Sequence, residues 1–574
     1  MKKNTLNKYA LIITLVILFH ICNNVYFLYR DNMPLVGDNF VAYEHSLNNY
    51  NRFIHGKVGG FLEQYIFFHY PELSFFPSFI SYPLFGNSED IVSFQGTIFL
   101  VILIIASYLL GKELFDRDVG LLAAVLISFS PFILAMSKVP FEDITFAAMF
   151  TLTLYFFIKS KKFSDIKYIW FFNISLALTL ISKFTSVFVL LCLFLFFLFI
   201  KILSDRSDFK DYFSKLNKRH IVHFLLSFFV SMFLPLLYFI TSVLKRFNDL
   251  YKDYNIPNIH FSDIVYAIFN YIKTLPMNFE HTFVFVIFIV SFVLFLSFSK
   301  KYRIQLISAI IGTNIYHFIM IFLFPLTVTN IYRFLIFIKP VYIIIISLFF
   351  IEYLYKFISA LFKRANIRFL NKARYSISLI IFFLVIFIPF TLVFNYTMYI
   401  KEPANLYPLY GKYRPARADY DIKEVFNKMI NKGNETILNF FPQNYFLDVF
   451  NLYALRHYDS VNVANTFFTK NGLEVKDKLF LNAEKYTYLL NNNTFNLEKL
   501  KEFDYVIVRE QVSEKDLYVA KQELTTEFYE ELPVYDAYYP SISSYLKTSG
   551  NFDLFRKIKI DNFNTTLIIY KNRI

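Results

Sequence analysis

Long apolar runs, each about the length of a membrane-spanning helix, recur through the first two thirds of the chain. A helix that crosses a bilayer needs about 20 predominantly apolar residues. Ser182 and Lys183 divide the longest run into two helices, because a charge left in hydrocarbon is costly. The pattern predicts eleven spanning helices, near residues 9–28, 91–111, 119–137, 142–159, 166–182, 184–201, 220–244, 281–299, 304–326, 333–355 and 375–396.

The lysines and arginines between these runs alternate from one side of the predicted membrane to the other. Segments 1–8, 112–118, 159–167, 201–219, 300–303 and 356–374 hold 24 of them, against 10 in the opposite loops before residue 397. Cytoplasmic loops of membrane proteins carry the excess of Lys and Arg. We therefore expect a multi-pass protein of the cell membrane with a cytoplasmic N-terminus and an extracytoplasmic C-terminal part.

Composition narrows the class of protein further. Of 574 residues, 56% are hydrophobic and only 18% are charged, whereas soluble domains average about 25% charged. Two cysteines, Cys22 and Cys192, lie in apolar runs and form no disulfide framework or CxxC metal site. A soluble enzyme, a disulfide scaffold and a disordered chain are excluded. The net charge of +14 is explained by the inner loops, so no nucleic-acid partner is expected.

Two long segments are predicted to lie outside the membrane. Residues 29–90 form an outer loop, and charges become frequent again after residue 397. The later segment alternates an amphipathic helix at 421–433, a strand at 436–440, a helix at 497–503, a strand at 504–508 and a hairpin at 557–570. The predicted organisation is a transmembrane domain 1–396 that includes the outer loop 29–90, followed by an extracytoplasmic α/β domain 397–574.

Short motifs follow one another along the first 340 residues. Asp38 comes after Pro34-Leu35 in the outer loop, and Glu142-Asp143 begins the fourth predicted span. The other motifs are His69-Tyr70-Pro71-Glu72-Leu73, Leu84-Phe85-Gly86, Ala177 to Lys183, and Ile331-Tyr332-Arg333-Phe334 leading to Pro340.

This series resembles the C-type-fold (GT-C) lipid-linked-sugar glycosyltransferases, the superfamily of protein O-mannosyltransferases and lipid A aminoarabinose transferases. Three positions depart from the family pattern: Asn39 replaces the second acid of a D-E pair, Glu72 replaces a proline, and Phe334 replaces a tyrosine. The resemblance implies an inverting glycosyltransferase. It would move a sugar from a polyprenyl-phosphate monosaccharide to a glycan, lipid or protein acceptor of the cell envelope.

Candidate catalytic residues follow from what such a transfer needs. A carboxylate must take the proton of the acceptor hydroxyl, and cations must hold the phosphate whose charge grows as the glycosidic bond breaks. Asp38 is predicted to be the base, with Glu142 or Asp143 in support. Lys183 and Arg333, at the outer ends of two predicted helices, are predicted to bind the donor phosphate.

Other readings stay open at this stage. His69 and Glu72, three residues apart, are weak candidates to bind a divalent metal ion, and no other cofactor is expected. A polytopic transporter or flippase of lipid-linked sugars and a non-catalytic envelope scaffold are the rival classes. Within the same fold, an oligosaccharyltransferase would carry a W-W-D motif outside the membrane, but the single tryptophan, Trp170, lies in a predicted span.

The alternation of basic loops makes the orientation testable. A reporter that is active only in the cytoplasm should be silent when fused after Ile574 and active when it replaces residues 206–215. Reporter activity after Ile574 would contradict the predicted orientation.

Overall fold

The computed structural model describes part of the chain, and its described residues fall into two compact units. The first unit comprises Met1–Leu28, Val58–Ser81 and Val92–Lys412; the second comprises Tyr29–Lys57, Tyr82–Ile91 and Tyr413–Ile574. Parts of the outer loop thus group with C-terminal residues. The sequence analysis assigned the whole loop to the membrane domain, and its boundary at 396/397 stays a prediction. Described are residues 3–30, 38–56, 72–183 with short gaps, 186, 190, 218–238, 286–294 without 287, 310, 338–351, 428–429, 435–440, 461–469, 472–477, 490–509 with short gaps, 539–560 and 565–573.

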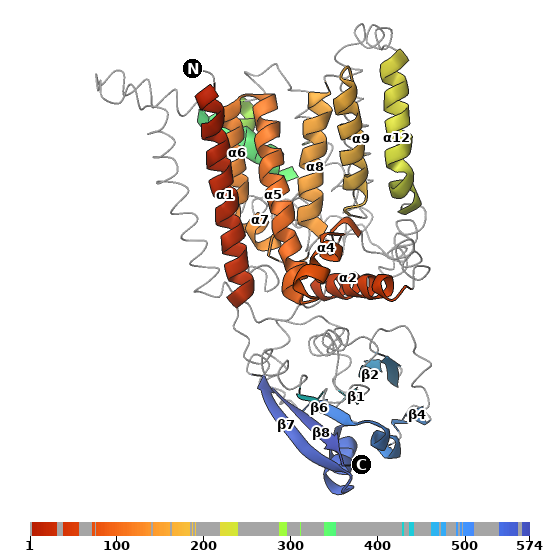
Figure 1. Cartoon of the computed structure of the whole chain (residues 1–574). Helices are drawn as coiled ribbons and strands as arrows, with labels where there is room; N and C mark the ends of the chain where they lie inside the picture. The colour runs from red at the N-terminus through yellow and green to blue at the C-terminus, as the bar shows by residue number, and fades with distance from the viewer. Residues whose placement is uncertain are drawn as a thin grey trace, which may run out of the picture. The chain divides into compact units, whose positions relative to one another are not determined.

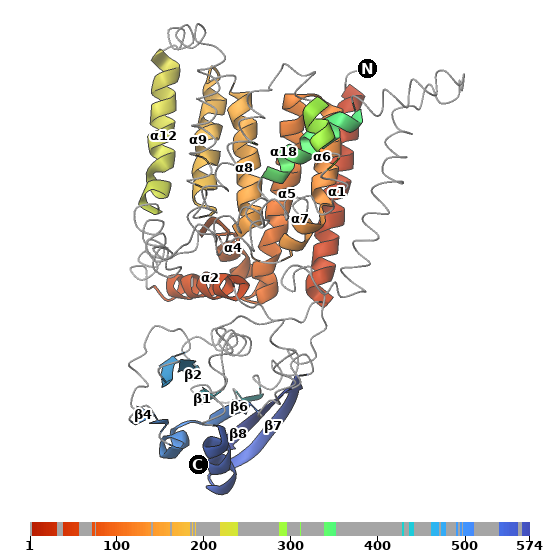
Figure 2. The same ribbon diagram turned by 180° about the vertical axis from the view of Figure 1, so that it is seen from behind.

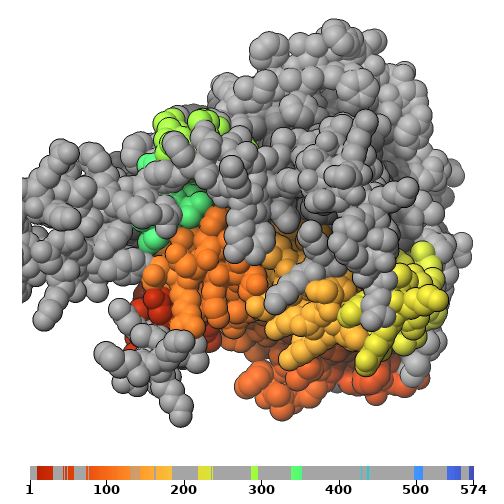
Figure 3. Space-filling model, turned by 90° about the horizontal axis from the view of Figure 1, so that it is seen from above, coloured from red at the N-terminus to blue at the C-terminus, as the bar shows by residue number. Residues whose placement is uncertain are grey.

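The first unit is a bundle of helices. Helices α8 and α9 pack against each other, α9 packs against α12, and α18 packs against α6 and α8. Helices α1, α5, α8, α9 and α12 run side by side in both ribbon views (Figures 1 and 2). In the space-filling view from above, the colours of this part pass from orange to yellow, in the order of the sequence (Figure 3). The helices are α1 (Lys3–Arg30), α5 (Glu89–Leu114), α6 (Arg117–Ser128), α7 (Pro131–Met136), α8 (Glu142–Lys159), α9 (Ile166–Leu180), α12 (Lys218–Tyr238) and α18 (Lys339–Phe349).

Length and side-chain exposure fit a bilayer environment. Among the described residues, two helical stretches are long and apolar enough to cross a membrane, Tyr9–Tyr29 and Asp90–Leu114, and Ile166–Leu180 and Lys339–Phe349 are shorter apolar helices. Large apolar side chains stand exposed along α12, where Phe229 and Phe233 are each 68% exposed. Such a surface suits lipid, since soluble proteins rarely expose contiguous apolar patches of this kind.

The predicted helix 119–137 is wrong in one respect, because the structure divides it into α6 and α7. Asp116 caps α6: its Oδ1 accepts hydrogen bonds from the backbone N–H groups of Asp118 and Val119, each at 2.9 Å. The helix ends at Ser128, and Pro131 begins α7. Proline has no N–H and restricts the residue before it to extended conformations, so the break is encoded locally.

A close approach of α5 and α6 holds this part of the bundle together. A Cβ atom at Gly120 would lie 2.5 Å from the carbonyl oxygen of Tyr108, and one at Gly111 would lie 2.8 Å from the Cα of Gly120. Small residues at helix contacts let backbones approach within a membrane. These two glycines therefore set the spacing of the α5–α6 pair.

Helices also occur in the outer segment that the sequence pattern treats as a loop. They are α2 (Asp38–Ile54), the 3₁₀ helix η1 (Glu72–Ser74) and α4 (Phe76–Phe85). Helix α2 buries Tyr43 and Leu47. In the second unit, the Ser46 hydroxyl lies 3.0 Å from the Tyr82 hydroxyl, and the ring of Tyr50 lies 5.1 Å from that of Tyr82.

The C-terminal residues form a mixed sheet, which confirms the strands predicted at 436–440 and 504–508 and the hairpin at 557–570. The sequence analysis did not predict the strands at 461–469 and 472–477. Strand β1 lies parallel to both β2 and β6, and the remaining pairs of the order β3-β2-β1-β6-β8-β7 are antiparallel. Consecutive residues Val506, Ile507 and Val508 are buried, as in a sheet covered on both faces. The strands are β1 (Glu435–Phe440), β2 (Val461–Thr469), β3 (Gly472–Asp477), β6 (Tyr505–Arg509), β7 (Phe552–Ile560) and β8 (Thr565–Asn572); β4 (Leu490–Asn491) and β5 (Thr494–Phe495) pair separately, and η11 (Leu497–Glu502) occupies the predicted helix 497–503.

Several predicted elements lie outside the described residues. These are the span 375–396, the spans 184–201 and 304–326 apart from residues 186, 190 and 310, most of 281–299, and the helix 421–433 apart from residues 428–429, which are helical.

The glycine contact of α5 and α6 generates a stability prediction. Gly120→Ala should destabilise the protein by about 1–3 kcal/mol, since an added methyl group must displace backbone atoms. Val230→Ala, at a side chain 62% exposed, is the control and should cost under about 0.5 kcal/mol. The check is the thermal unfolding midpoint in detergent; equal midpoints for both variants would contradict the close packing.

Candidate functional site

The first turn of α8 carries two adjacent carboxylates. Glu142 and Asp143 begin the helix, where the unpaired N–H groups and the helix dipole stabilise negative charge. Both side chains are buried: Asp143 is 0% and Glu142 is 8% exposed. Buried carboxylates require a compensating partner.

That partner is Lys183, three residues after the end of α9. Its Nζ forms an ion pair with Asp143 Oδ1 and lies 3.5 Å from Glu142 Oε1. Lys183 itself is only 2% exposed. The structure therefore brings together three of the sequence-predicted site residues, and we call Glu142, Asp143 and Lys183 the buried ion cluster.

The stoichiometry of the buried ion cluster bears on its chemistry. Two carboxylates and one ammonium meet in this cluster. The cluster can thus orient its carboxylates, and a strong anion site would need a further cation.

Two further buried lysines were not identified from the sequence. Lys138 Nζ lies 4.4 Å from the centre of the Phe27 ring, a cation–π contact. Lys339 Nζ lies 3.5 Å from Ser130 Oγ. Both lysines are under 7% exposed; Lys138 belongs to the connection from α6 to α8, and Lys339 contacts Ser130 of that connection. Ionisable groups at membrane depth are functional candidates by default.

Helix α1 contributes buried polar side chains that the sequence analysis also missed. His20 and Asn24 are 0% exposed. Within the described part of the chain, neither ring nitrogen of His20 has a hydrogen-bond partner. Their signal in the sequence is a spacing of four within an apolar run, which places both on one helix face.

The remaining predicted residues are placed only in part. Asp38 is the first residue of α2 and Glu72 the first of η1. His69 and Arg333 lie outside the described residues. Among the residues that the structure describes, no group of three or more His, Cys, Asp and Glu side chains could hold a metal ion.

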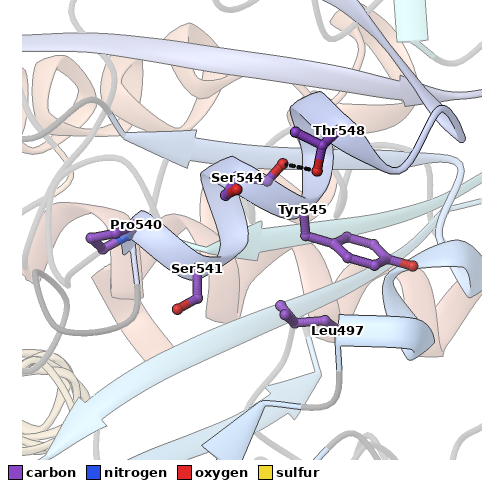
Figure 4. A pocket seen from close by; sticks show the side chains of 6 residues that line it. All are labelled: Leu497, Pro540, Ser541, Ser544, Tyr545 and Thr548. Carbon is purple, nitrogen blue, oxygen red and sulfur yellow. Dashed lines mark hydrogen bonds between the residues drawn. The ribbon is translucent and has the colours of Figure 1, made fainter.

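The second unit has a pocket of its own beside the helix 539–548. Figure 4 shows hydroxyl side chains of Ser541, Ser544, Tyr545 and Thr548 on this helix, with Leu497 opposite. Thr548 Oγ1 donates a hydrogen bond to the carbonyl oxygen of Ser544 at 2.8 Å. Burial, followed by the charge of Glu498, raises the pKa of the Tyr545 phenol. This pocket therefore offers neutral hydroxyl groups, unlike the buried ion cluster.

Comparison with known proteins relates the chain to membrane glycosyltransferases. The family model described as dolichyl-phosphate-mannose-protein mannosyltransferase matches residues 71–239, a range that contains the buried ion cluster. No curated protein sequence matches the chain.

Solved structures with a similar fold span nearly the whole chain. ArnT from Cupriavidus metallidurans in the apo state aligns with a TM-score of 0.53 at 11% identity and covers 98% of each chain. The same protein bound to undecaprenyl phosphate aligns with a TM-score of 0.53 at 10% identity, covering 99% of this chain and 98% of ArnT. The Archaeoglobus fulgidus oligosaccharyltransferase in the apo form gives 0.52 at 12% identity, covering 92% of this chain and 72% of that enzyme.

These findings confirm the predicted resemblance. The chain has the GT-C fold of polytopic membrane glycosyltransferases, with a C-terminal domain, and its residues 71–239 match the mannosyltransferase family model.

The buried ion cluster generates a second stability prediction. Lys183→Met should destabilise the protein by about 3–5 kcal/mol, because it removes one member of a buried ion pair and leaves the charge of the other in a low dielectric. Adding Asp143→Asn to Lys183→Met should restore part of the loss.

The matched control is Lys159→Met. Lys159 Nζ pairs with Glu113 Oε2 at 2.7 Å, and these side chains are 28% and 22% exposed. Breaking such a solvent-accessible pair should cost about 1 kcal/mol or less. Unfolding midpoints in detergent check both values, and similar losses at Lys159 and Lys183 would mean that Lys183 is not buried with its partners.

Proposed function

We propose that this protein is an integral membrane glycosyltransferase of the extracytoplasmic face. It takes a sugar from a polyprenyl-phosphate monosaccharide and transfers it, with inversion, to an acceptor hydroxyl. The observation that carries the proposal is the buried ion cluster, which lies within the segment 71–239 that matches the mannosyltransferase family model. The likeness in fold to ArnT, which has been solved with undecaprenyl phosphate, supports this class of donor.

The reaction requires a general base for the acceptor hydroxyl and cations for the departing phosphate. A polyprenyl phosphate is a good leaving group without protonation, so the protein must stabilise the growing phosphate charge. Lys183 and Arg333 supply the positive charge that holds the phosphate. Arginine suits this role because its planar fork binds phosphate oxygens in pairs.

Asp38 is proposed as the general base. It takes the proton of the acceptor hydroxyl while that oxygen attacks the anomeric carbon from the face opposite the phosphate. Asn39 stands where the family pattern has a second acid, so Glu142 and Asp143 supply the supporting negative charge.

Asp38→Asn tests the base. The amide keeps the size of the side chain but cannot accept the proton, so turnover should fall by about 10²–10⁴-fold while binding of undecaprenyl phosphate persists. Transfer is measured in nanodiscs with a panel of undecaprenyl-phosphate hexoses and pentoses and a membrane lipid extract as acceptor.

Asp31→Asn is the matched control, since it removes the same charge from the same outer segment, and it should retain turnover. Undiminished transfer by a correctly inserted Asp38→Asn variant would refute the base assignment. A wild-type protein that moves lipid-linked sugar across vesicles without transferring it would favour a flippase.

A further inference from the structure

One face of α1 contacts the connection from α6 to α8 at three points. His20, Asn24 and Phe27 are four and three residues apart, which aligns them along the helix. The His20 ring lies 4.6 Å from the ring of Phe129, and Phe27 lies below Lys138. Between these contacts, Asn24 reaches Ser137.

Of the three α1 residues, Asn24 makes the polar contact. Its Nδ2 donates to Ser137 Oγ at 2.9 Å and to Thr97 Oγ1 of α5 at 3.0 Å, and lies 3.4 Å from the carbonyl oxygen of Ser137. Asn24 and Ser137 are both 0% exposed. Because both side chains are buried, breaking this contact would leave polar atoms unsatisfied in a low dielectric, so the contact favours one arrangement of the two segments.

Helix α5 also packs against the backbone of Ser137. A Cβ atom at Gly96 would lie 2.6 Å from the carbonyl oxygen of Ser137. The absence of a side chain at Gly96 thus lets the backbone of Ser137 approach α5 closely. Ser137 is held from α1 by a hydrogen bond and from α5 by backbone contact.

The segment held in this way leads directly into the buried ion cluster. Glu142 follows Ser137 by five residues and Asp143 by six, so the position of Ser137 sets where α8 begins. Resting on the function proposed above, we propose that Asn24 is a positioning residue: by fixing Ser137 it places Glu142 and Asp143 at the distance from Lys183 that the transfer reaction requires.

The chain offers a closely matched control on another helix pair. Asn173 of α9 is also 0% exposed, and its Nδ2 donates to Ser227 Oγ of α12 at 2.6 Å and lies 3.3 Å from the carbonyl oxygen of Phe224. Asn173 thus has the same side chain, burial and partner types as Asn24. It contacts α12 and not the connection that carries Ser137.

The experiment compares Asn24→Leu with Asn173→Leu in full-length protein in nanodiscs. Both should lower the thermal midpoint by a similar amount. Only Asn24→Leu should lower kcat, by about 10- to 100-fold, since small displacements of catalytic groups cost that much. Gly96→Ala, which displaces Ser137 from its other side, should reproduce the kinetic loss.

A double-mutant cycle in kcat distinguishes a positioning role of Asn24 from general destabilisation of the protein. The kcat of the double variant Ser137→Ala/Asn24→Leu should be no lower than that of Asn24→Leu alone, because Ser137→Ala removes a contact that Asn24→Leu has already removed. Asn24→Gln, which keeps the amide, should recover part of kcat, and it serves as the test variant where Asn24→Leu fails to insert.

The outcomes separate this inference from the proposal on which it rests. Asp143→Asn with full turnover, or wild-type protein without transfer, would overturn the catalytic use of the buried ion cluster and the positioning role with it. Loss of turnover in Asp143→Asn, together with an unchanged kcat in Asn24→Leu, would overturn the positioning role alone.

Discussion

A lysine ammonium enclosed with two carboxylates is the interaction on which the first unit depends. In a medium of low dielectric, unpaired ions are far more costly than in water. Lys183 at the end of α9 and the first turn of α8 therefore cannot separate without leaving buried charge. The two helices are locked at this end, while the Thr153 and Thr179 hydroxyls, 2.9 Å apart, join them again further along.

The same principle of paired polar groups extends across the bundle. Asn173 joins α9 to α12, and Asn24 joins α1 to the segment before α8. Apolar side chains gain little by meeting each other instead of lipid, so hydrogen bonds and close packing must supply the specificity of helix contacts in a membrane. The first unit combines a lipid-facing apolar surface with a small number of such polar contacts.

Much of this arrangement could be predicted from the sequence, because hydrophobic periodicity is a local property. The runs at 9–28, 91–111 and 142–159 correspond to α1, α5 and α8, and β1, β6 and the β7–β8 hairpin lie where strands were predicted, whereas β2 and β3 were missed. Helix α2 was missed because its few buried residues, Tyr43 and Leu47 among them, are interspersed with polar ones. The break before Pro131 was missed because the apolar run continues through it.

The sequence could identify residues of the candidate site but could not show how they lie relative to one another. Motif positions singled out Glu142, Asp143 and Lys183, and the structure brings them together. Their mutual pairing depends on the packing of α8 against α9, which no local pattern encodes. The contributions of Asn24 and Lys138 were hidden for the same reason, since their partners come from residues more than 70 positions away or from another helix.

The short length of α6 has a consequence for how the protein enters the membrane. Its 12 residues rise only about 18 Å at 1.5 Å per residue, less than the roughly 30 Å of the hydrocarbon core. As a separate segment it would leave its terminal backbone groups unsatisfied in lipid. Because Gly111 and Gly120 bring it against α5, the two helices can enter the membrane as one hairpin.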